Sequence, residues 1–200
     1  MTGTARIWRG LKWLVPITST IAVMGVIAVF AYGLVNVAHG STLVSEVAAG
    51  KKPPAPEFKL ESFWPSTGPP SPAVANAIQN GTLDLSRLRG HPVVLNFWAS
   101  WCIACRAEAT LLGGAAATNP RVVFVGVDVQ DLRGDAIGFL RRYGVTYTAV
   151  WDKTNSTYVN YGLTGVPETY YLDPRGQIVA HDAGAVSETS LALGIRKAGG

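Results

Sequence analysis

The sequence predicts an α/β domain, in which helices flank a central β-sheet, preceded by a membrane-spanning helix. Three observations support this prediction. Apolar, β-branched runs alternate with helix-favouring stretches through the second half of the 200-residue chain. The only two cysteines, Cys102 and Cys105, stand between a strand-like run and a helix-like run. Residues 14–37 carry no charge and are rich in Ile, Val, Ala and Leu, which is long enough for a helix that crosses a bilayer.

The N-terminal apolar segment predicts the orientation of the chain in a membrane. Residues 1–13 contain three basic residues and no acidic residue, whereas the stretch after the apolar run carries only Glu46 before residue 51. Because cytoplasmic flanks are enriched in Lys and Arg, we expect residues 1–13 in the cytoplasm and everything after residue 38 outside it. Residues 14–38 would then be a single-pass anchor in the cell membrane. A cleaved signal peptide is the alternative, but its apolar core is usually only about 7–15 residues long.

The charge of the chain follows the same division. All 13 acidic residues lie after position 40, together with 14 of the 17 basic residues, so the exported part is nearly neutral although the whole chain carries +4. This balance gives no reason to expect a nucleic-acid partner. Residues 39–55 are polar and become proline-rich at their end, which predicts a tether that is stiff where it meets the domain. Residues 56–200 have the length of one domain.

The first half of this domain alternates short strands with turns. Its first apolar and polar alternation follows the tether, and a proline-rich insert at residues 64–81 then interrupts regular structure. Asn80-Gly81 is a strong turn pair, and Gly90 ends a short helical run. The next run, residues 93–98, is apolar except for a single Asn. We therefore expect strands over residues 58–61, 82–85 and 93–98, and helical turns over residues 74–79 and 85–90.

The second half predicts alternating helices and strands. A nearly continuous β-branched run at residues 122–129 indicates a strand that is covered on both faces. Asp173-Pro174-Arg175-Gly176 predicts a tight turn between two antiparallel strands. The order of elements, β-α-β-α-β-β-α, is typical of a sheet with helices packed against it. We expect strands over residues 122–129, 149–151, 169–172 and 177–180, and helices over residues 106–118, 135–143, 158–161 and 187–197.

The two cysteines predict a redox pair. Cys102 lies where a helix begins, and unpaired N–H groups and the helix dipole favour an anion there, so we expect its thiolate to form near neutral pH. Cys105 is one helical turn further and within reach for a disulfide. A zinc site would need four ligands, and the chain has no second cysteine pair and only three scattered histidines. A purely structural disulfide would close so short a loop that it would stabilise little.

Three separated motifs resemble one known family. They are LRGHPVVLNFWASWC at residues 88–102, CRAE at residues 105–108 and YGLTGVPETY at residues 161–170. In wording and order they resemble membrane-anchored thiol–disulfide oxidoreductases of the TlpA/ResA kind, which serve cytochrome c maturation and related extracytoplasmic redox reactions. The resemblance covers about residues 56–198 and implies a thioredoxin fold, a central mixed β-sheet flanked by helices.

The pattern assigns catalytic roles to three residues. Cys102 is the expected nucleophile, because exchange proceeds by thiolate attack on a disulfide, and Cys105 is the resolving thiol. Glu108 lies three residues after Cys105 and shares a helix face with it, and the resemblance implies that this position handles the proton of the resolving thiol. Asn96 stands where thioredoxin has a buried aspartate and cannot ionise, so another group must take that proton. The alternative for Glu108 is a solvated glutamate in the first turn of a helix.

The resemblance also implies a substrate-binding edge. Pro167 is expected to be cis and to face the cysteines, with the main chain of Val166 free to pair with an extended substrate. Glu168 is expected either to help recognise substrate or tune Cys102, or to be an exposed carboxylate at a strand end. Trp101 is expected to form a wall of the site. His181 is expected at the surface near the end of its strand.

These residues together predict an enzyme that reduces disulfides in exported proteins. The favoured substrate is the haem-binding Cys-x-x-Cys-His of apocytochrome c, and a thiol–disulfide electron donor in the membrane would re-reduce the pair. No cofactor other than the redox-active disulfide, and no metal, is expected. Two alternatives remain: an oxidase or isomerase of exported proteins, and a non-enzymatic thioredoxin-like module that binds a metal or a partner. The latter would need a histidine beside the cysteines.

Overall fold

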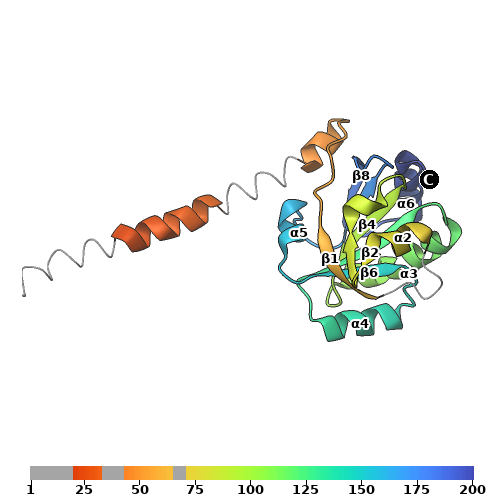
Figure 1. The fold of residues 1–200 in the computed structure, drawn as a ribbon, viewed down its shortest axis with the longest axis horizontal. Helices are drawn as coiled ribbons and strands as arrows, with labels where there is room; N and C mark the ends of the chain where they lie inside the picture. Colours follow the sequence, from red (N-terminus) through yellow and green to blue (C-terminus); the bar gives the residue numbers. More distant parts are fainter. Residues whose placement is uncertain (1–19, 33–42, 65–70) are drawn as a thin grey trace, which may run out of the picture. The chain divides into compact units, whose positions relative to one another are not determined.

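The computed structural model of the protein describes residues 20–32, 43–64 and 71–200 (Figure 1). The chain divides into two compact units, and the boundary between them in the sequence lies after Ala38. The larger unit holds the sheet and both cysteines.

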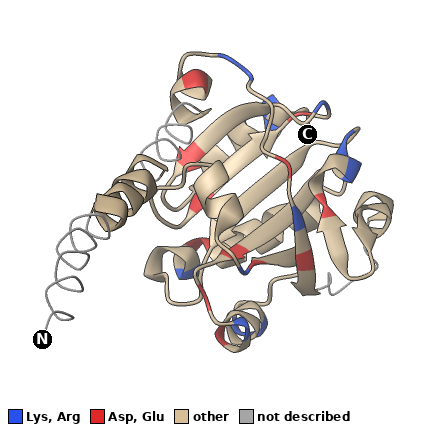
Figure 2. Ribbon diagram, turned by 60° about the vertical axis from the view of Figure 1, so that its left-hand side comes forward, with Lys and Arg blue, Asp and Glu red and all other residues tan. Residues whose placement is uncertain are grey.

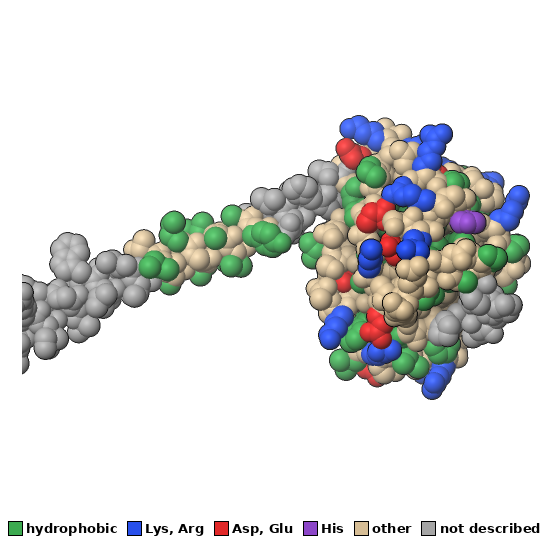
Figure 3. Space-filling view, viewed as in Figure 1, with side chains coloured by type: hydrophobic (Ala, Val, Ile, Leu, Met, Phe, Trp, Pro, Cys, Tyr) green, Lys and Arg blue, Asp and Glu red, His purple; other side chains and the backbone are tan. Residues whose placement is uncertain are grey.

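In the N-terminal unit, residues 20–32 form a helix. All of its residues are exposed, and Figure 3 shows apolar side chains on the face of the helix that is in view. Within the part of the chain that the structure describes, no helix combines the length and the apolar character that crossing a membrane requires. The expected cytoplasmic segment, residues 1–13, and both ends of the expected anchor, residues 14–38, lie outside the described residues.

The larger unit is built on one eight-stranded mixed sheet with the strand order β2-β3-β1-β6-β5-β4-β7-β8. The three central strands, β4, β5 and β6, run parallel to one another, and all other neighbours pair antiparallel. The strands are β1 (Lys59–Trp64), β2 (Ile78–Gln79), β3 (Thr82–Asp84), β4 (Val93–Trp98), β5 (Val123–Val129), β6 (Thr148–Asp152), β7 (Glu168–Leu172) and β8 (Ile178–Ala183).

Helices cover both faces of this sheet (Figure 1). Buried residues of α3, α4 and α6 pack on one face. Those of α2 and η1 pack on the other, together with the partly buried Tyr158 of α5. The predicted α/β architecture is therefore confirmed. The helices are α2 (Pro72–Ala77), the 3-10 helix η1 (Leu85–Leu88), α3 (Ile103–Thr118), α4 (Arg133–Arg142), α5 (Ser156–Asn160) and α6 (Glu188–Ala198).

Two elements differ from the sequence prediction near the proline-rich insert. The first strand runs on to Trp64, so that β1 pairs with β6 as well as with β3. Residues 78–79 form strand β2 instead of continuing a helical turn. The reason is the turn that follows, because Asn80 (φ 50°) and Gly81 (φ 75°) both adopt the left-handed conformation that a tight hairpin between β2 and β3 requires. Residues 65–70 of the insert lie outside the described residues.

Part of the segment that we expected as a tether is packed on the domain. Residues 43–48 form a helix, and Leu43 and Val47 contact the core on the α5 side of the sheet. Further on, Pro54 forms a β-bridge with Gln177. The backbone N–H of Ile178 donates to the carbonyl of Pro53 at 2.8 Å. The chain thus enters the domain along the outer strand β8.

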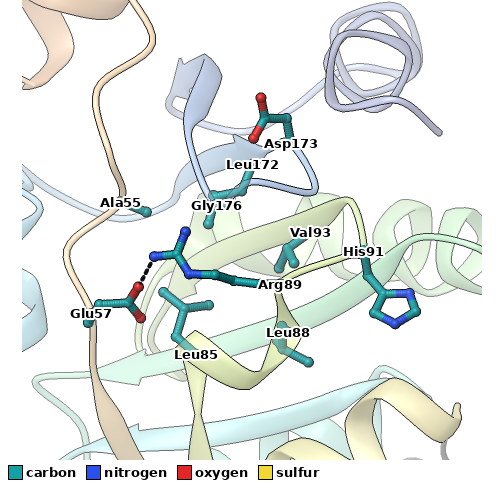
Figure 4. A pocket seen from close by; sticks show the side chains of 10 residues that line it. All are labelled: Ala55, Glu57, Leu85, Leu88, Arg89, His91, Val93, Leu172, Asp173 and Gly176. Carbon is teal, nitrogen blue, oxygen red and sulfur yellow. Dashed lines mark hydrogen bonds and ion pairs between the residues drawn. The ribbon is translucent and has the colours of Figure 1, made fainter.

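Arg89 lies near Val93, at the start of β4, and Leu172, at the end of β7 (Figure 4). This is the end of β4 opposite to the one that the cysteines follow. The guanidinium group of Arg89 contacts the carboxylate of Glu57 and the backbone carbonyl of Arg175. These contacts leave a hollow of only about 10 Å³, room for about one water molecule. Gly176 (φ 75°) permits this approach, since a Cβ atom there would lie 2.7 Å from the guanidinium group.

The two cysteines lie beyond the carboxyl end of strand β4. All six residues of β4 are buried, as expected for a strand between two neighbours with helices on both faces. The cysteines follow this strand directly, at the edge where open α/β sheets place their functional sites. Acidic and basic residues are interspersed around the unit and form no patch of one sign in Figure 2.

Candidate active site

A disulfide joins Cys102 and Cys105 at the start of α3. Cys102 is the N-cap residue of this helix, and its sulfur accepts a hydrogen bond from the backbone N–H of Cys105 at 3.0 Å. The 16-residue helix directs the positive end of its dipole at the same sulfur. Cys102 is 4% exposed and Cys105 is 1% exposed. The environment of Cys102 therefore favours negative charge on its sulfur when the pair is reduced.

The loop before β7 lies against Cys102. The Val166–Pro167 peptide bond is cis, as the sequence analysis predicts. The carbonyl oxygen of Val166 lies 3.4 Å from the sulfur of Cys102. Backbone groups of this loop thus border the disulfide directly.

Glu108 is buried beneath the redox pair, one helical turn after Cys105. One carboxylate oxygen accepts the side-chain amide of Asn96 at 2.8 Å, and the other accepts the backbone N–H of Val186 at 2.8 Å. Burial raises the pKa of Glu108, and these two hydrogen bonds offset only part of that effect. Its side chain is 2% exposed, so the solvated alternative is excluded. Asn96 also donates to Thr169 at 3.1 Å, which links the group to β7.

Glu168 lies on the opposite face of the sheet and is also buried. One carboxylate oxygen accepts hydrogen bonds from the backbone N–H of Thr164 at 2.8 Å, from its hydroxyl at 3.1 Å and from the N–H of Gly165 at 3.3 Å. The other lies 2.7 Å from Nε2 of His181. Burial alone would raise the pKa of Glu168, but the hydrogen bonds and the His181 charge outweigh it, and the pKa lies below its ordinary value.

The expectation that His181 lies at the surface is wrong. Its side chain is only 7% exposed, because it points from β8 onto Tyr170, with the two rings 4.3 Å apart. The alternative of an exposed carboxylate at Glu168 is likewise excluded by its burial. The pairing joins residues 13 positions apart through the hairpin of β7 and β8, a contact that no local pattern indicates.

The two tryptophans beside the cysteines have different environments. Trp98 is buried and stacks on Phe139 of α4, with ring centroids 4.6 Å apart. Trp101 is 54% exposed, and its indole N–H donates to the carbonyl of Gln130 at 3.0 Å. Beside it runs a groove of about 380 Å³ that Trp151 also lines. Trp101 thus borders the cysteine loop, where the sequence analysis places a wall.

The sequence analysis missed two aspartates at the carboxyl end of β5. Asp131 accepts hydrogen bonds from the backbone N–H and the hydroxyl of Ser100, the latter at 2.9 Å, and so holds the loop before Trp101. Asp128 is fully buried, and neither of its carboxylate oxygens has a hydrogen-bond partner among the described residues. Burial and the charge of Asp131 raise the pKa of Asp128 to about 9. A charged residue inside the β-branched run was the available signal.

The described residues contain no group of three or more His, Cys, Asp or Glu side chains that could hold a metal ion. The two carboxylates near the disulfide are hydrogen-bonded to neighbouring side chains, Glu108 to Asn96 and Glu168 to His181.

Known proteins resemble this chain in sequence and in fold. The sequence profile of the AhpC/TSA family matches residues 52–181. The chain belongs to this family. It is 32% identical over 167 residues to the thiol:disulfide interchange protein DsbE of Xylella fastidiosa, an alignment that covers 83% of this chain and 78% of the relative. It is 33% identical over 141 residues to the thiol:disulfide interchange protein HelX of Rhodobacter capsulatus, covering 70% of each chain.

Solved structures that are similar to this chain come from the same class of protein as the sequence relatives. The structure of MTB dsbF in its mixed oxidized and reduced forms is 30% identical, has a TM-score of 0.58 and covers 70% of this chain and 92% of its own. A secreted Mycobacterium tuberculosis disulfide oxidoreductase homologous to E. coli DsbE is 25% identical with a TM-score of 0.57, covering 70% and 94%. The predicted family, the thioredoxin-like fold and the thiol–disulfide oxidoreductase class of the chain are thereby confirmed.

Proposed function

We propose that the protein is a membrane-anchored reductase of disulfides in exported proteins, with the haem-binding Cys-x-x-Cys-His of apocytochrome c as its favoured substrate. One observation carries the proposal for the site. Cys102 receives the N–H of Cys105 at the start of α3 and faces the backbone carbonyl of Val166. This arrangement supplies an activated sulfur and, next to it, a backbone edge that accepts an extended peptide.

The reaction runs in two exchange steps. The Cys102 thiolate attacks one sulfur of the substrate disulfide, forms a mixed disulfide and releases the other substrate sulfur as a thiolate. Cys105 then loses its proton and attacks Cys102, which releases the second substrate sulfur and leaves the Cys102–Cys105 disulfide. Two electrons pass from the protein to the substrate, and the two substrate thiolates take up protons. A dithiol donor in the membrane returns the electron pair.

Glu108 is assigned to the proton of Cys105. It is one turn along the same helix, is buried with it, and has a raised pKa. A carboxylate with a raised pKa accepts a proton near neutral pH more readily than an ordinary glutamate does. Asn96 positions this carboxylate through its 2.8 Å hydrogen bond and has no proton to exchange itself.

Substrate binding is assigned to the residues that border the disulfide. Trp101 supplies an apolar wall, and Val166 and cis-Pro167 supply backbone on the other side. Backbone pairing gives affinity with little dependence on sequence, which suits an enzyme that reads a cysteine pair in an extended segment. Glu168 accepts hydrogen bonds from Thr164 and Gly165 in the loop that carries Val166.

The anchor is residues 14–38, with residues 1–13 in the cytoplasm and the domain outside it. The exposed apolar side chains of residues 20–32 support this assignment, as does the basic flank before them. Anchoring raises the local concentration of the domain near a membrane donor. Extraction with alkaline carbonate tests it: the full chain stays with the membrane fraction, and release into the supernatant contradicts the anchor.

Replacing Cys105 with Ser tests the reaction. The variant cannot resolve the mixed disulfide, so substrates should remain bonded to Cys102 and be identified after purification. Capture of apocytochrome c supports the proposal, and capture of only oxidised folding intermediates contradicts it. The reduction potential tests the direction of electron flow: about −200 mV or below favours reduction of substrates, and about −120 mV favours an oxidase.

A further inference from the structure

The buried contact between Glu168 and His181 bears on how the substrate-binding loop is held. The two residues lie on adjacent antiparallel strands, β7 and β8, and their side chains are 4% and 7% exposed. Two buried groups of this kind are stable in the interior because each satisfies the other. The contact leaves one carboxylate oxygen of Glu168 free for other donors.

That second oxygen holds the loop that precedes cis-Pro167. It accepts three hydrogen bonds, two from Thr164 and one from the backbone of Gly165. Val166 follows at once, with its carbonyl 3.4 Å from the sulfur of Cys102. The chain of contacts therefore runs from β8 through Glu168 to the backbone that borders the disulfide.

The other groups that face this contact do not replace the charge of His181. Tyr170 of β7 and Tyr158 of α5 stay neutral, because burial first and the charge of Glu168 second raise the pKa of both phenols. On the covering helix of residues 43–48, Glu46 is paired with Lys51 at 3.6 Å. The charged groups at the outer side of β8 that line the same hollow as His181 are Asp182 and Lys197. Asp182 accepts the hydroxyl of Tyr171.

We propose that His181 is a positioning residue for substrate binding: through Glu168 it fixes the Thr164–Pro167 loop, and so sets the backbone edge that receives an extended peptide beside Cys102. This inference rests on the proposed function. It concerns peptide substrates specifically, because a small dithiol reaches the sulfur without pairing to Val166. His181 touches neither the reacting sulfurs nor, in this scheme, the substrate.

The test compares the full-length chain with His181→Gln and His181→Arg, and uses His91→Gln as a matched control at an exposed histidine. Two reactions are followed. One is reduction of a synthetic peptide that carries a Cys-x-x-Cys-His disulfide, and the other is reduction of the oxidised protein by dithiothreitol. His181→Gln should raise KM for the peptide by about fivefold or more with kcat little changed, since a buried charge-assisted hydrogen bond is lost. The dithiothreitol rate should stay within about twofold, and His181→Arg and His91→Gln should match the wild type.

Two outcomes overturn the inference. One is a peptide KM for His181→Gln within twofold of the wild type. The other is an equal fall of the peptide and dithiothreitol rates, which indicates a general structural role. If the wild-type chain does not reduce the peptide at all, both the proposed function and the role of His181 are refuted. If the wild type is active and the variant is unchanged, only the role of His181 is refuted.

A second variant decides the case if His181→Gln does not fold. Thr164→Val removes only the hydroxyl that donates to Glu168 at 3.1 Å and leaves His181 in place. Its peptide KM should rise while the dithiothreitol rate stays within about twofold. An unchanged peptide KM would contradict a role for the Glu168 contacts in holding the loop.

Discussion

The side-chain amide of Asn96 donates to the carboxylate of Glu108 at 2.8 Å, in a site where both residues are almost fully buried. Asn96 stands on the strand that leads to Cys102, and Glu108 stands on the helix that begins there. The hydrogen bond therefore ties the acid to the strand, at a fixed position one helical turn beyond Cys105. In the proposed mechanism, this fixed carboxylate is the group that takes the proton of Cys105.

Glu108→Gln should slow the second exchange step and leave the first less affected. Glutamine keeps the size of the side chain but cannot accept a proton, and general base catalysis contributes about 10²-fold or more. Its amide nitrogen replaces one acceptor oxygen, so one of the hydrogen bonds from Asn96 and Val186 is lost. The mixed disulfide with substrate should accumulate, as measured on non-reducing gels during single turnover. In the wild type the second step should weaken as the pH falls through the raised pKa of Glu108, which lies above the ordinary 4.5. Glu188→Gln, at the first turn of α6, serves as control, and an equal effect there would contradict the assignment.

Asp128→Asn should flatten the dependence of stability on pH. In the folded protein the pKa of Asp128 is raised from 3.8 to about 9, so at neutral pH the folded state holds a proton that the unfolded state has released. Stability from this group is therefore present below about pH 4 and declines as the pH rises toward about 9, by up to about 1.4 kcal/mol per pH unit. Urea unfolding at pH 5 and pH 8 should show a smaller difference for the variant. An unchanged difference would contradict the buried, protonated state, and Asp135→Asn, an exposed neighbour, is the control.

Asp131→Asn should loosen the loop that carries Trp101. The carboxylate accepts two hydrogen bonds from Ser100, and their weakening should lower the free energy of unfolding by about 1–2 kcal/mol. Ser100→Ala removes only the hydroxyl bond and should cost less. Acrylamide quenching of tryptophan fluorescence should increase in Asp131→Asn, and equal quenching in variant and wild type would contradict a role in holding the loop.

Two helical glycines should respond to alanine in opposite directions. Gly114 in α3 has open space around the position of a Cβ atom, so Gly114→Ala should stabilise the protein by up to about 1 kcal/mol through helix propensity. Gly194 in α6 packs against the ring of Tyr171, and a Cβ atom there would lie 2.3 Å from it. Gly194→Ala should therefore destabilise the protein by about 1–3 kcal/mol. Thermal unfolding measures both, and two shifts of the same sign would contradict this packing.

Local patterns in the sequence predicted the elements that depend on local physics. The β-branched run at residues 122–129 became β5, and the turn pair Asn80-Gly81 became a hairpin. The cysteine spacing placed the disulfide at a helix start. Pro167 was expected to be cis from its motif rather than from spacing, and the structure agrees.

The features that the sequence did not indicate depend on contacts across the sheet. His181 resembled a polar residue at the end of a strand, and only the β7–β8 pairing places it on Glu168. Asp128 stood out only as a charged residue within a β-branched run, and its complete burial becomes visible only when helices pack on β5. Burial is a property of the assembled layers, so residue type and spacing do not determine it.

Pro53 and Pro54 pair with the start of the outer strand β8, which has a consequence for self-association. An outer strand offers free N–H and C=O groups to any neighbouring chain. Proline has no N–H group, so it occupies part of this border without offering a donor of its own to a further strand. The same few residues that bring the polypeptide into the domain thus occupy the border at which a second molecule could extend the sheet.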